Sequence, residues 1–326
     1  MDTFLLTLKV VSLLLVYLAI GFFLGKKKIA GENAGKTLAV LINFVIMPIY
    51  NMANLSKNVT VDKISLYIEL FLAGSVLMVV SLAVCIPLSR IFFKKGFLRN
   101  IYKYLLFTSN IGYFGYPLVE SVFGEEMLSM YMIFVLPFSF AIYTYGYLIL
   151  TDKSEEFETY PDESAIKARR KDMLKRLFSL PIIGTFVGIA LGLLPFEMPE
   201  IFYEFLSPAA ECMRAIVMIL MGLVLSEMSF KTLFTSKKAY LLCLMRLVIY
   251  PTVFGGIAYA LYLSGMSSEI FIFTVCLMAL PAGLNVVVCP EAVGLSGKEG
   301  AQACFISYLF ALVTLPLIFL AVAALV

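Results

Sequence analysis

The chain has 326 residues, of which 61% are hydrophobic and 14% are charged, and its formal net charge is +3. Soluble domains are about 45–50% apolar and about 25% charged, so this composition excludes an ordinary soluble protein and indicates a chain that lies mostly in a lipid bilayer. So small a net charge gives no indication of a nucleic-acid partner.

The chain has no histidine and six cysteines. Without histidine, any proton coupling would need carboxylates or another group. The cysteines fall in or beside apolar spans and form no CxxC pair, which is typical of small buried side chains rather than disulfides or metal ligands. The sequence contains no nucleotide-binding motif and no nucleophile paired with histidine. We therefore predict neither an ATP-driven pump nor an enzyme, and no metal or other cofactor.

Long apolar spans recur along the whole chain. They suit helices that cross a bilayer, and they lack the alternation of short barrel strands. The sequence therefore predicts an all-α membrane protein with ten transmembrane helices. Their expected ranges are 4–24, 37–55, 65–92, 103–123, 128–150, 178–195, 207–227, 239–263, 268–289 and 302–325.

The basic residues are distributed unevenly around these spans. They gather after the first, third, fifth, seventh and ninth spans, and the four exceptions are Lys9, Lys57, Lys63 and Arg214. Because cytoplasmic loops are enriched in Lys and Arg, both termini are expected outside the cell. We therefore expect a multi-pass protein of the plasma (inner) membrane.

One polar stretch, 151–177, divides the spans into two sets of five. We expect it to be a cytoplasmic loop between a first repeat, 1–150, and a second repeat, 178–326. Because five is odd, the two repeats would lie in opposite orientations. A short echo between the segments that follow Pro117 and Pro290 agrees with this inverted repeat.

Two of the spans are interrupted. The fourth contains Ser109–Leu118, with two glycines and a proline, and the ninth contains Pro281-Ala-Gly-Leu-Asn285. In a helix interior Gly costs about 1 kcal/mol and Pro about 3 kcal/mol relative to Ala. In lipid the freed backbone groups must be received by protein or by a polar cavity. Broken spans at matching places in two halves are typical of the binding site of a secondary transporter.

If the two breaks cross near the midplane, two half-helices begin there, near Pro117 and Asn285. Their positive N-terminal ends would attract an anion such as a carboxylate, and the carbonyls of the other two ends would suit a cation. The alternative is a pair of kinks with glycines for close packing. The candidate substrate-binding residues at the breaks are Asn110, Gly112, Gly115, Pro117, Pro281 and Asn285.

Ionisable residues inside spans are functional candidates. Glu120 and Glu291 follow the two breaks and are candidates for proton or cation coupling, unless they meet solvent or a backbone donor at the interface. Arg214 either neutralises a substrate carboxylate or pairs with Glu211, which shares its helix face.

Asn43 and Asn51 lie on the second predicted helix, together with Asn54. Asn43 and Asn51 are further substrate-binding candidates because their amides would line a cavity beside the breaks. Hydrogen bonds between helices would explain them equally well.

Five motifs occur along the chain in a consistent order. They are Asn43-x-x-x-x-Pro48, Asn110-x-Gly-x-x-Gly115-x-Pro117-Leu118, Gly222-x-x-Leu225, Arg246-Leu-Val-x-x-Pro251 and Leu280-Pro-Ala-Gly-x-Asn285. Together they resemble the motifs of the auxin efflux carrier family, over essentially the whole chain. The short 151–177 loop resembles that of microbial members, since it lacks the long loop of many plant carriers.

The resemblance implies a ten-helix fold with broken, crossing helices 4 and 9, like that of bile-acid and sodium/proton transporters. Helices 1, 2, 6 and 7 would form a scaffold, as a homodimer, and helices 3–5 and 8–10 a transport domain that moves as an elevator. Plant members export the auxin anion, and bacterial members are associated with malate and other carboxylates. Asn285 stands where many plant members have proline, which weakens the case for auxin itself.

The sequence therefore predicts a secondary transporter of a small organic carboxylate, auxin-like or malate-like, with H⁺ or Na⁺ as possible coupling ions. One alternative is a sodium-coupled symporter of an organic solute on the same fold. Another is a membrane sensor that binds its ligand without moving it, although the small inner loop leaves little room for an output domain.

Overall fold

The computed structural model describes residues 2–31, 33–93, 96–151, 178–196 and 198–325. Helices account for the regular structure of these residues, and no strand occurs among them. The predicted cytoplasmic loop, 151–177, lies outside the described residues except for Thr151.

The first half of the chain forms the following elements, in which η1, η3 and η4 are π-helical turns and η2 is a 3₁₀ turn. They are α1 (Asp2–Lys26), α2 (Ala34–Leu41), η1 (Ile42–Ile46), α3 (Met47–Asn58), η2 (Val61–Lys63), α4 (Ile64–Phe92), α5 (Phe97–Phe107), η3 (Ile111–Gly115), α6 (Tyr116–Phe123), α7 (Glu125–Phe134), α8 (Leu136–Ala141), η4 (Ile142–Gly146) and α9 (Tyr147–Thr151).

The second half is also helical, with one π-helical turn, η5. Its elements are α11 (Leu180–Gly192), α12 (Glu200–Glu211), α13 (Met213–Ser226), α14 (Phe230–Leu233), α15 (Lys237–Leu244), η5 (Met245–Ile249), α16 (Tyr250–Leu263), α17 (Ser268–Ala279), α18 (Asn285–Ala292) and α19 (Lys298–Leu325).

Several of these elements join end to end into longer rods. Within the described residues, six rods are long and apolar enough to cross a membrane, and α7 with α8–α9, bent by 51°, would make a seventh. α11 and α17 are apolar but shorter. The all-helical, membrane-compatible character predicted from the sequence is therefore confirmed. The six rods are Thr3–Lys26, Ala34–Asn58, Val61–Phe92, Glu200–Ser226, Lys237–Leu263 and Lys298–Leu325.

Three of the π-helical turns are followed by a proline in the second position of the next helix. Pro48 follows η1, Pro117 follows η3 and Pro251 follows η5. Proline has no N–H and its ring clashes with the carbonyl four residues earlier. A π-helical turn widens the backbone just before this point, so the rod continues through the proline. Three of the sequence motifs are thus the sites of these wide turns.

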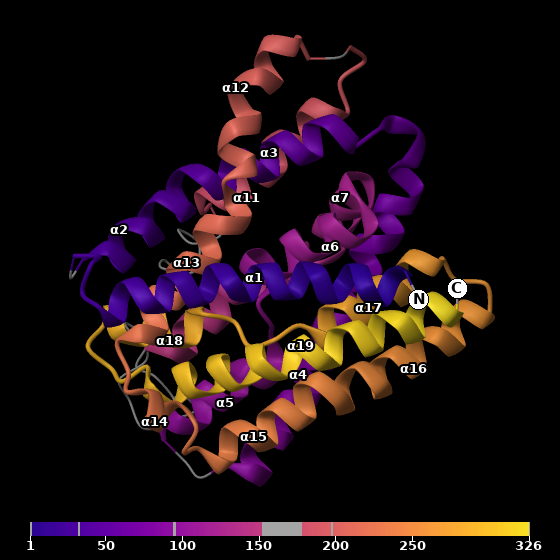
Figure 1. The fold of residues 1–326 in the computed structure, drawn as a ribbon. Helices are drawn as coiled ribbons and strands as arrows, with labels where there is room; N and C mark the ends of the chain where they lie inside the picture. The colour runs from indigo at the N-terminus through magenta and orange to yellow at the C-terminus, as the bar shows by residue number, and fades with distance from the viewer. Residues whose placement is uncertain (1, 32, 94–95, 152–177, 197, 326) are drawn as a thin grey trace, which may run out of the picture.

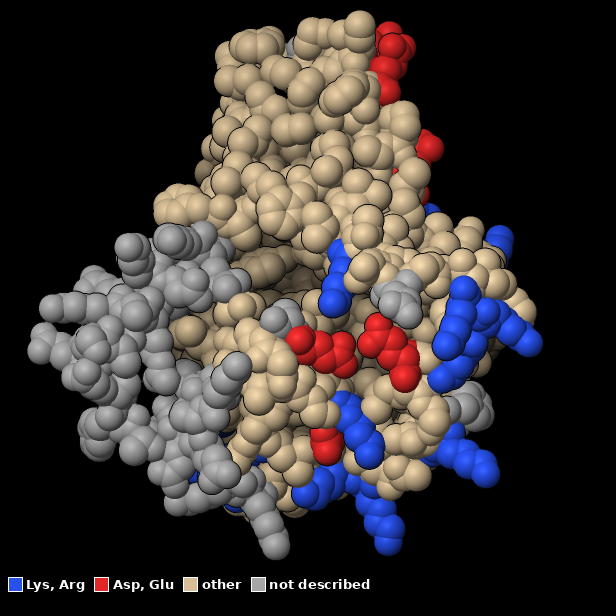
Figure 2. Space-filling view, turned by 90° about the vertical axis from the view of Figure 1, so that its left-hand side faces the viewer, with Lys and Arg blue, Asp and Glu red and all other residues tan. Residues whose placement is uncertain are grey.

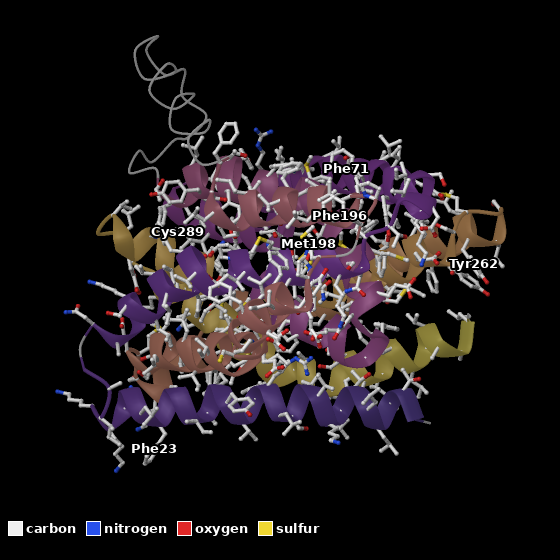
Figure 3. The ribbon with its side chains drawn as sticks, turned by 90° about the horizontal axis from the view of Figure 1, so that it is seen from above. Phe23, Phe71, Phe196, Met198, Tyr262 and Cys289 are labelled. Atoms are coloured by element: carbon white, nitrogen blue, oxygen red, sulfur yellow. The ribbon has the colours of Figure 1, made fainter. Side chains whose placement is uncertain are left out.

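The helices are apolar on their outward faces as well as in their interior. Phe23 on α1 is 55% exposed and points away from the bundle, and Phe71 on α4 lies near the opposite edge (Figure 3). Val76 on α4 and Ile257 on α16 are also exposed. Such outward apolar faces suit contact with lipid acyl chains.

The two termini lie close together at one end of the bundle, and the basic side chains gather at the other end. α1 starts and α19 finishes at the same end of the rods (Figure 1). The opposite end carries many Lys and Arg side chains around its rim (Figure 2). Lys and Arg side chains of several described segments thus share this face of the molecule.

Two pairs of helices, α1 with α13 and α3 with α11, pack with their backbones in close contact. α1 packs along α13, and a methyl group at Gly222 would lie only 2.0 Å from the carbonyl oxygen of Leu18. α11 packs along α3 in the same way, since a methyl group at Gly184 would lie 2.4 Å from the carbonyl oxygen of Pro48. Small residues that let backbones touch are the usual means of helix association in membranes.

We expect Gly222→Leu to destabilise the fold because α1 and α13 would have to separate. Overpacking of this kind costs about 1–3 kcal/mol. Thermal unfolding in detergent measures the effect. The matched control is Gly256→Leu on α16, where an added methyl group meets nothing within 4 Å. Equal unfolding temperatures for the two variants would show that the α1–α13 contact can relax.

Candidate functional site

Two helices are broken inside the bundle. α5 ends at Phe107 and the chain is extended at Thr108, with φ −132° and ψ 160°, before η3 begins. α17 ends at Ala279 and the chain is extended at Leu280, with φ −64° and ψ 145°, before α18 begins at Asn285. The interruptions lie where glycine and proline in the sequence predict them.

The two breaks are bonded to each other. The backbone N–H of Asn110 donates to the carbonyl of Pro281 over 2.9 Å, and Ser109 Oγ donates to the carbonyl of Leu277 over 3.1 Å. A methyl group at Gly283 would come within 3.1 Å of the Ser109 carbonyl oxygen. Each break therefore receives backbone groups that the other has freed, as burial away from water requires.

α19 supports both breaks from one side. Tyr308 donates its hydroxyl proton to the carbonyl of Ala282 over 2.7 Å and accepts from Asn110 Nδ2 over 3.0 Å. Ser307 Oγ accepts from the backbone N–H of Ala282 over 3.0 Å. Tyr308 and Ser307 were not predicted as site residues, although polar side chains within a largely apolar span would have been a usable signal.

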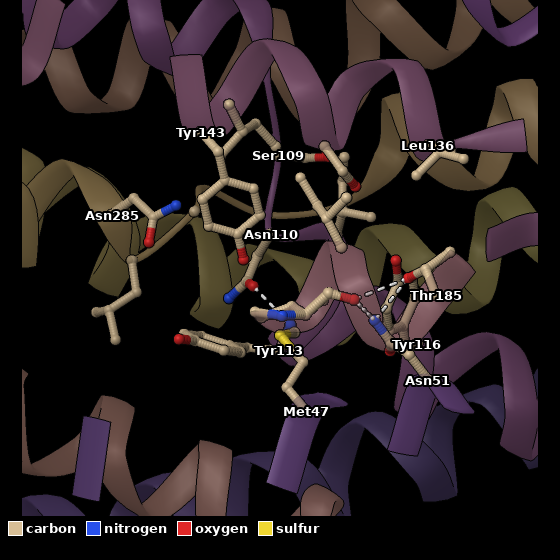
Figure 4. Close-up of a pocket in the computed structure, with 18 of the residues that line it drawn as sticks. Met47, Asn51, Ser109, Asn110, Tyr113, Tyr116, Leu136, Tyr143, Thr185 and Asn285 are labelled. Carbon is tan, nitrogen blue, oxygen red and sulfur yellow. Dashed lines mark hydrogen bonds between the residues drawn. The ribbon is translucent and has the colours of Figure 1, made fainter. Parts of the chain in front are cut away.

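A cavity of about 60 Å³ lies beside the breaks, with room for several water molecules or a small polar group. The broken helices and α8–η4 form one wall and α3 with α11 form the other (Figure 4). Among the described residues no Asp, Glu, Lys or Arg lines it. Its lining residues are Met47, Asn51, Tyr104, Ser109, Asn110, Ile111, Gly112, Tyr113, Tyr116, Leu136, Ser139, Ile142, Tyr143, Pro181, Ile182, Thr185, Gly283, Leu284 and Asn285.

Three of the asparagines predicted from the sequence meet in this cavity. Asn110 caps η3 by accepting from the backbone N–H of Tyr113 over 3.2 Å. Asn285, at the start of α18, donates to the hydroxyl of Tyr104 over 3.2 Å. On the opposite wall, Asn51 donates to Thr185 Oγ1 over 3.0 Å.

The amide oxygen of Asn51 is buried and has no hydrogen-bond partner in the described part of the chain. An unpaired buried carbonyl costs free energy unless water or a ligand satisfies it. Gly112 also lines the cavity, so a solute there would meet groups from both broken helices and from α3.

The remaining predicted residues lie at different distances from the cavity. Asn43 does not line the cavity, but its Nδ2 donates to the hydroxyl of the lining residue Tyr113 over 2.9 Å. Gly115, Pro117 and Pro281 shape the broken backbone without lining the cavity. Glu291 is exposed on α18 and is also outside the cavity lining.

Tyrosines make up much of the lining and were missed from the sequence. Tyr104, Tyr113, Tyr116 and Tyr143 all face the cavity, with Tyr143 above Asn110 and Tyr113 below it in Figure 4. For Tyr113, Tyr116 and Tyr143 the usable signal was their position within the predicted spans 103–123 and 128–150. Aromatic residues that anchor helices to the membrane interface lie at the ends of spans instead.

A second cavity, of about 430 Å³, lies between α3, α6 and α12–α13. Glu120 on α6 is held here from two sides. Its Oε1 lies 2.6 Å from Arg214 Nη2, and its Oε2 accepts from the Tyr50 hydroxyl over 2.6 Å. The structure thus pairs Arg214 with Glu120 rather than with Glu211. The ion pair joins α6 to α13, while Tyr50 joins it to α3.

A pair of tyrosine rings lies between the two cavities. Tyr50 lines the larger cavity and Tyr116 lines the smaller one. Their rings stack with centroids 6.3 Å apart and an interplanar angle of 18°. The pair therefore joins a lining residue of one cavity to a lining residue of the other.

Paired broken helices around a polar cavity in a membrane-embedded bundle are typical of a transporter. A family model described as "Membrane transport protein" matches residues 6–319. The chain belongs to this family of membrane transporters, the auxin efflux carrier family that its motifs resemble. It is also 23% identical to an uncharacterized transporter of Methanocaldococcus jannaschii, in an alignment that covers 94% of this chain and 96% of the relative.

We expect the Glu120–Arg214 pair to couple in a double-mutant cycle of Glu120→Gln and Arg214→Ala. The Arg214 side chain is 44% exposed, so solvent screening limits the coupling to about 0.5–1 kcal/mol. Thermal or denaturant unfolding of the four proteins measures it. The matched control is the Lys57–Glu125 pair, whose side chains are 58% and 50% exposed and should couple by about 0–0.5 kcal/mol. Additive effects of the two Glu120–Arg214 substitutions would mean that the pair does not hold α6.

Proposed function

We propose that this protein is a secondary transporter that carries a small organic carboxylate, auxin-like or malate-like, across the plasma (inner) membrane. The observation that carries the proposal is the smaller cavity. It is lined by Asn110 and Asn285 at the starts of two half-helices, and no ionisable Asp, Glu, Lys or Arg of the described residues lines it. The positive ends of these half-helices are then the main source of electrostatic attraction, and they favour an anion.

The proposed architecture is a set of ten spans arranged as two inverted five-helix repeats, 1–150 and 178–326. The six long rods and the bent pair α7–α9 account for seven spans. α11 and the two broken helices, α5–α6 and α17–α18, would supply the other three. The contact between the breaks of α5–α6 and α17–α18 supports this arrangement, because inverted repeats bring their matching helices together.

The proposed mechanism is elevator-type alternating access. α1, α2–α3, α11 and α12–α13 would form the scaffold, and the remaining rods the transport domain. The position of the smaller cavity supports this division, since Asn51 and Thr185 belong to the scaffold wall and Asn110 and Asn285 to the moving wall. A homodimer through the scaffold stays a prediction from the family resemblance.

For the coupling, we propose that transport is coupled to H⁺ or to no ion. A sodium-coupled symporter is the alternative. Glu120 is engaged by Arg214 and Tyr50, so it would have to be released before it could exchange a proton. Glu291 is exposed and lies outside both cavities, which makes it the weaker coupling candidate.

The proposal is tested by charge displacement from purified protein in liposomes. We expect a saturable current for at least one member of a panel of mono- and dicarboxylates and indole-3-acetate. Imposed pH and sodium gradients identify the coupling. No current for any member, from protein shown to be folded, would favour a different solute or a sensor that binds without transport.

We expect Asn110→Ala and Asn285→Ala each to weaken the apparent affinity for the active carboxylate by about tenfold. Each removes one polar group at a half-helix start, and one hydrogen bond to a charged group is worth about 1.5–3 kcal/mol. Asn33→Ala is the matched control, because Asn33 is exposed and makes no side-chain cap at the start of α2. Unchanged affinity in both variants would contradict the proposal that the carboxylate binds in the smaller cavity.

A further inference from the structure

The two breaks expose two C-terminal helix ends as well as two N-terminal ones, and the C-terminal ends converge on one side chain. Arg246, in η5, is only 2% exposed. Its Nη1 donates to the carbonyl of Leu106 over 3.3 Å, and its Nη2 to the carbonyl of Leu277 over 3.5 Å. Leu106 lies in the last turn of α5 and Leu277 in the last turn of α17.

The position of the Arg246 guanidinium at these two helix ends matters because of the charge that the ends carry. The C-terminal end of a helix carries about half a negative charge, so two ends that meet are balanced by about one positive charge. In transporters with paired broken helices, such carbonyl-rich ends are where Na⁺ or H⁺ is held. Here the guanidinium of Arg246 supplies the cation from within the chain.

No carboxylate in the described part of the chain forms an ion pair with Arg246. Besides its hydrogen bonds to the two carbonyls, its guanidinium lies over the ring of Tyr250, with Cζ 5.7 Å from the ring centroid. Its Nε has no partner among the same residues. A buried charge without a counter-ion is costly, so the helix ends must provide the stabilisation.

We propose that Arg246 is a tethered cation that occupies the place of a mobile coupling cation at the crossing of the broken helices. This inference rests on the proposed function, because it concerns how the carboxylate is carried. Na⁺ is then neither needed nor accommodated, and the carried anion moves with its own net charge. Arg246 acts by fixing the two C-terminal ends, so it is a positioning residue rather than part of the substrate cavity.

The first test measures carboxylate-evoked current from wild-type protein while Na⁺ is exchanged for N-methylglucamine at constant ionic strength. We expect no change. A saturable stimulation by Na⁺ would overturn the proposal. Arg246→Lys keeps a cation at the site and should retain most of the current, whereas Arg246→Met should lose about tenfold or more. Equal loss in both variants would also overturn the proposal, because it would show a need for shape rather than charge.

The second test needs no transported substrate, so it stands even if no carboxylate evokes a current. The unfolding temperature of Arg246→Ala is compared in Na⁺, in millimolar guanidinium and in N-methylglucamine at constant ionic strength. We expect Na⁺ or guanidinium to raise the unfolding temperature of this variant by several degrees and to leave wild type and Arg90→Ala unchanged. Arg90 is an exposed arginine on α4 and serves as the control for loss of one charge.

A destabilised Arg246→Ala that responds to no added cation would overturn the proposal and leave Arg246 a packing residue. If Arg246→Ala does not fold, wild type and Arg246→Lys carry the test. Their unfolding temperatures should be insensitive to Na⁺, and stabilisation of either protein by Na⁺ would overturn the proposal.

Discussion

The structure depends on how backbone polar groups are satisfied where two helices break inside an apolar bundle. At the breaks the helical ladder stops, and no lipid can replace the lost hydrogen bonds. The Asn110 N–H therefore bonds to the Pro281 carbonyl, and α19 receives the carbonyl of Ala282 through Tyr308. Because each break completes the other, the two broken helices are fixed as one unit. The position of the polar cavity follows from that unit.

The same constraint separates charge across the crossing point. The half-helix starts at Asn110 and Asn285 face the cavity, so the positive ends of the dipoles lie where we propose that the anion binds. The half-helix ends at Leu106 and Leu277 face Arg246 on the other side. In the proposed function the positive ends attract the anion, while Arg246 donates hydrogen bonds to carbonyls at the two negative ends.

Proline and glycine have distinct tasks in this architecture. Pro48, Pro117 and Pro251 each follow a π-helical turn, which lets a rod continue past a residue that cannot donate a backbone hydrogen bond. Glycines such as Gly222 and Gly184 instead let neighbouring helices touch backbone to backbone. The prolines thus shape rods near the crossing, and the glycines tie together the helices that we propose as the scaffold.

The sequence by itself determined the features that depend on local chemistry. Apolar length indicated membrane helices, glycine and proline located both breaks, and the family motifs identified a transporter. Tertiary structure alone decided which side chains meet. Glu120 pairs with Arg214 across 94 positions of sequence, Tyr308 reaches Asn110 from the last helix, and Arg246 lies against both broken helices. Helical periodicity tells which residues share a face of one helix, but not which other helix packs against that face, because packing depends on the whole bundle.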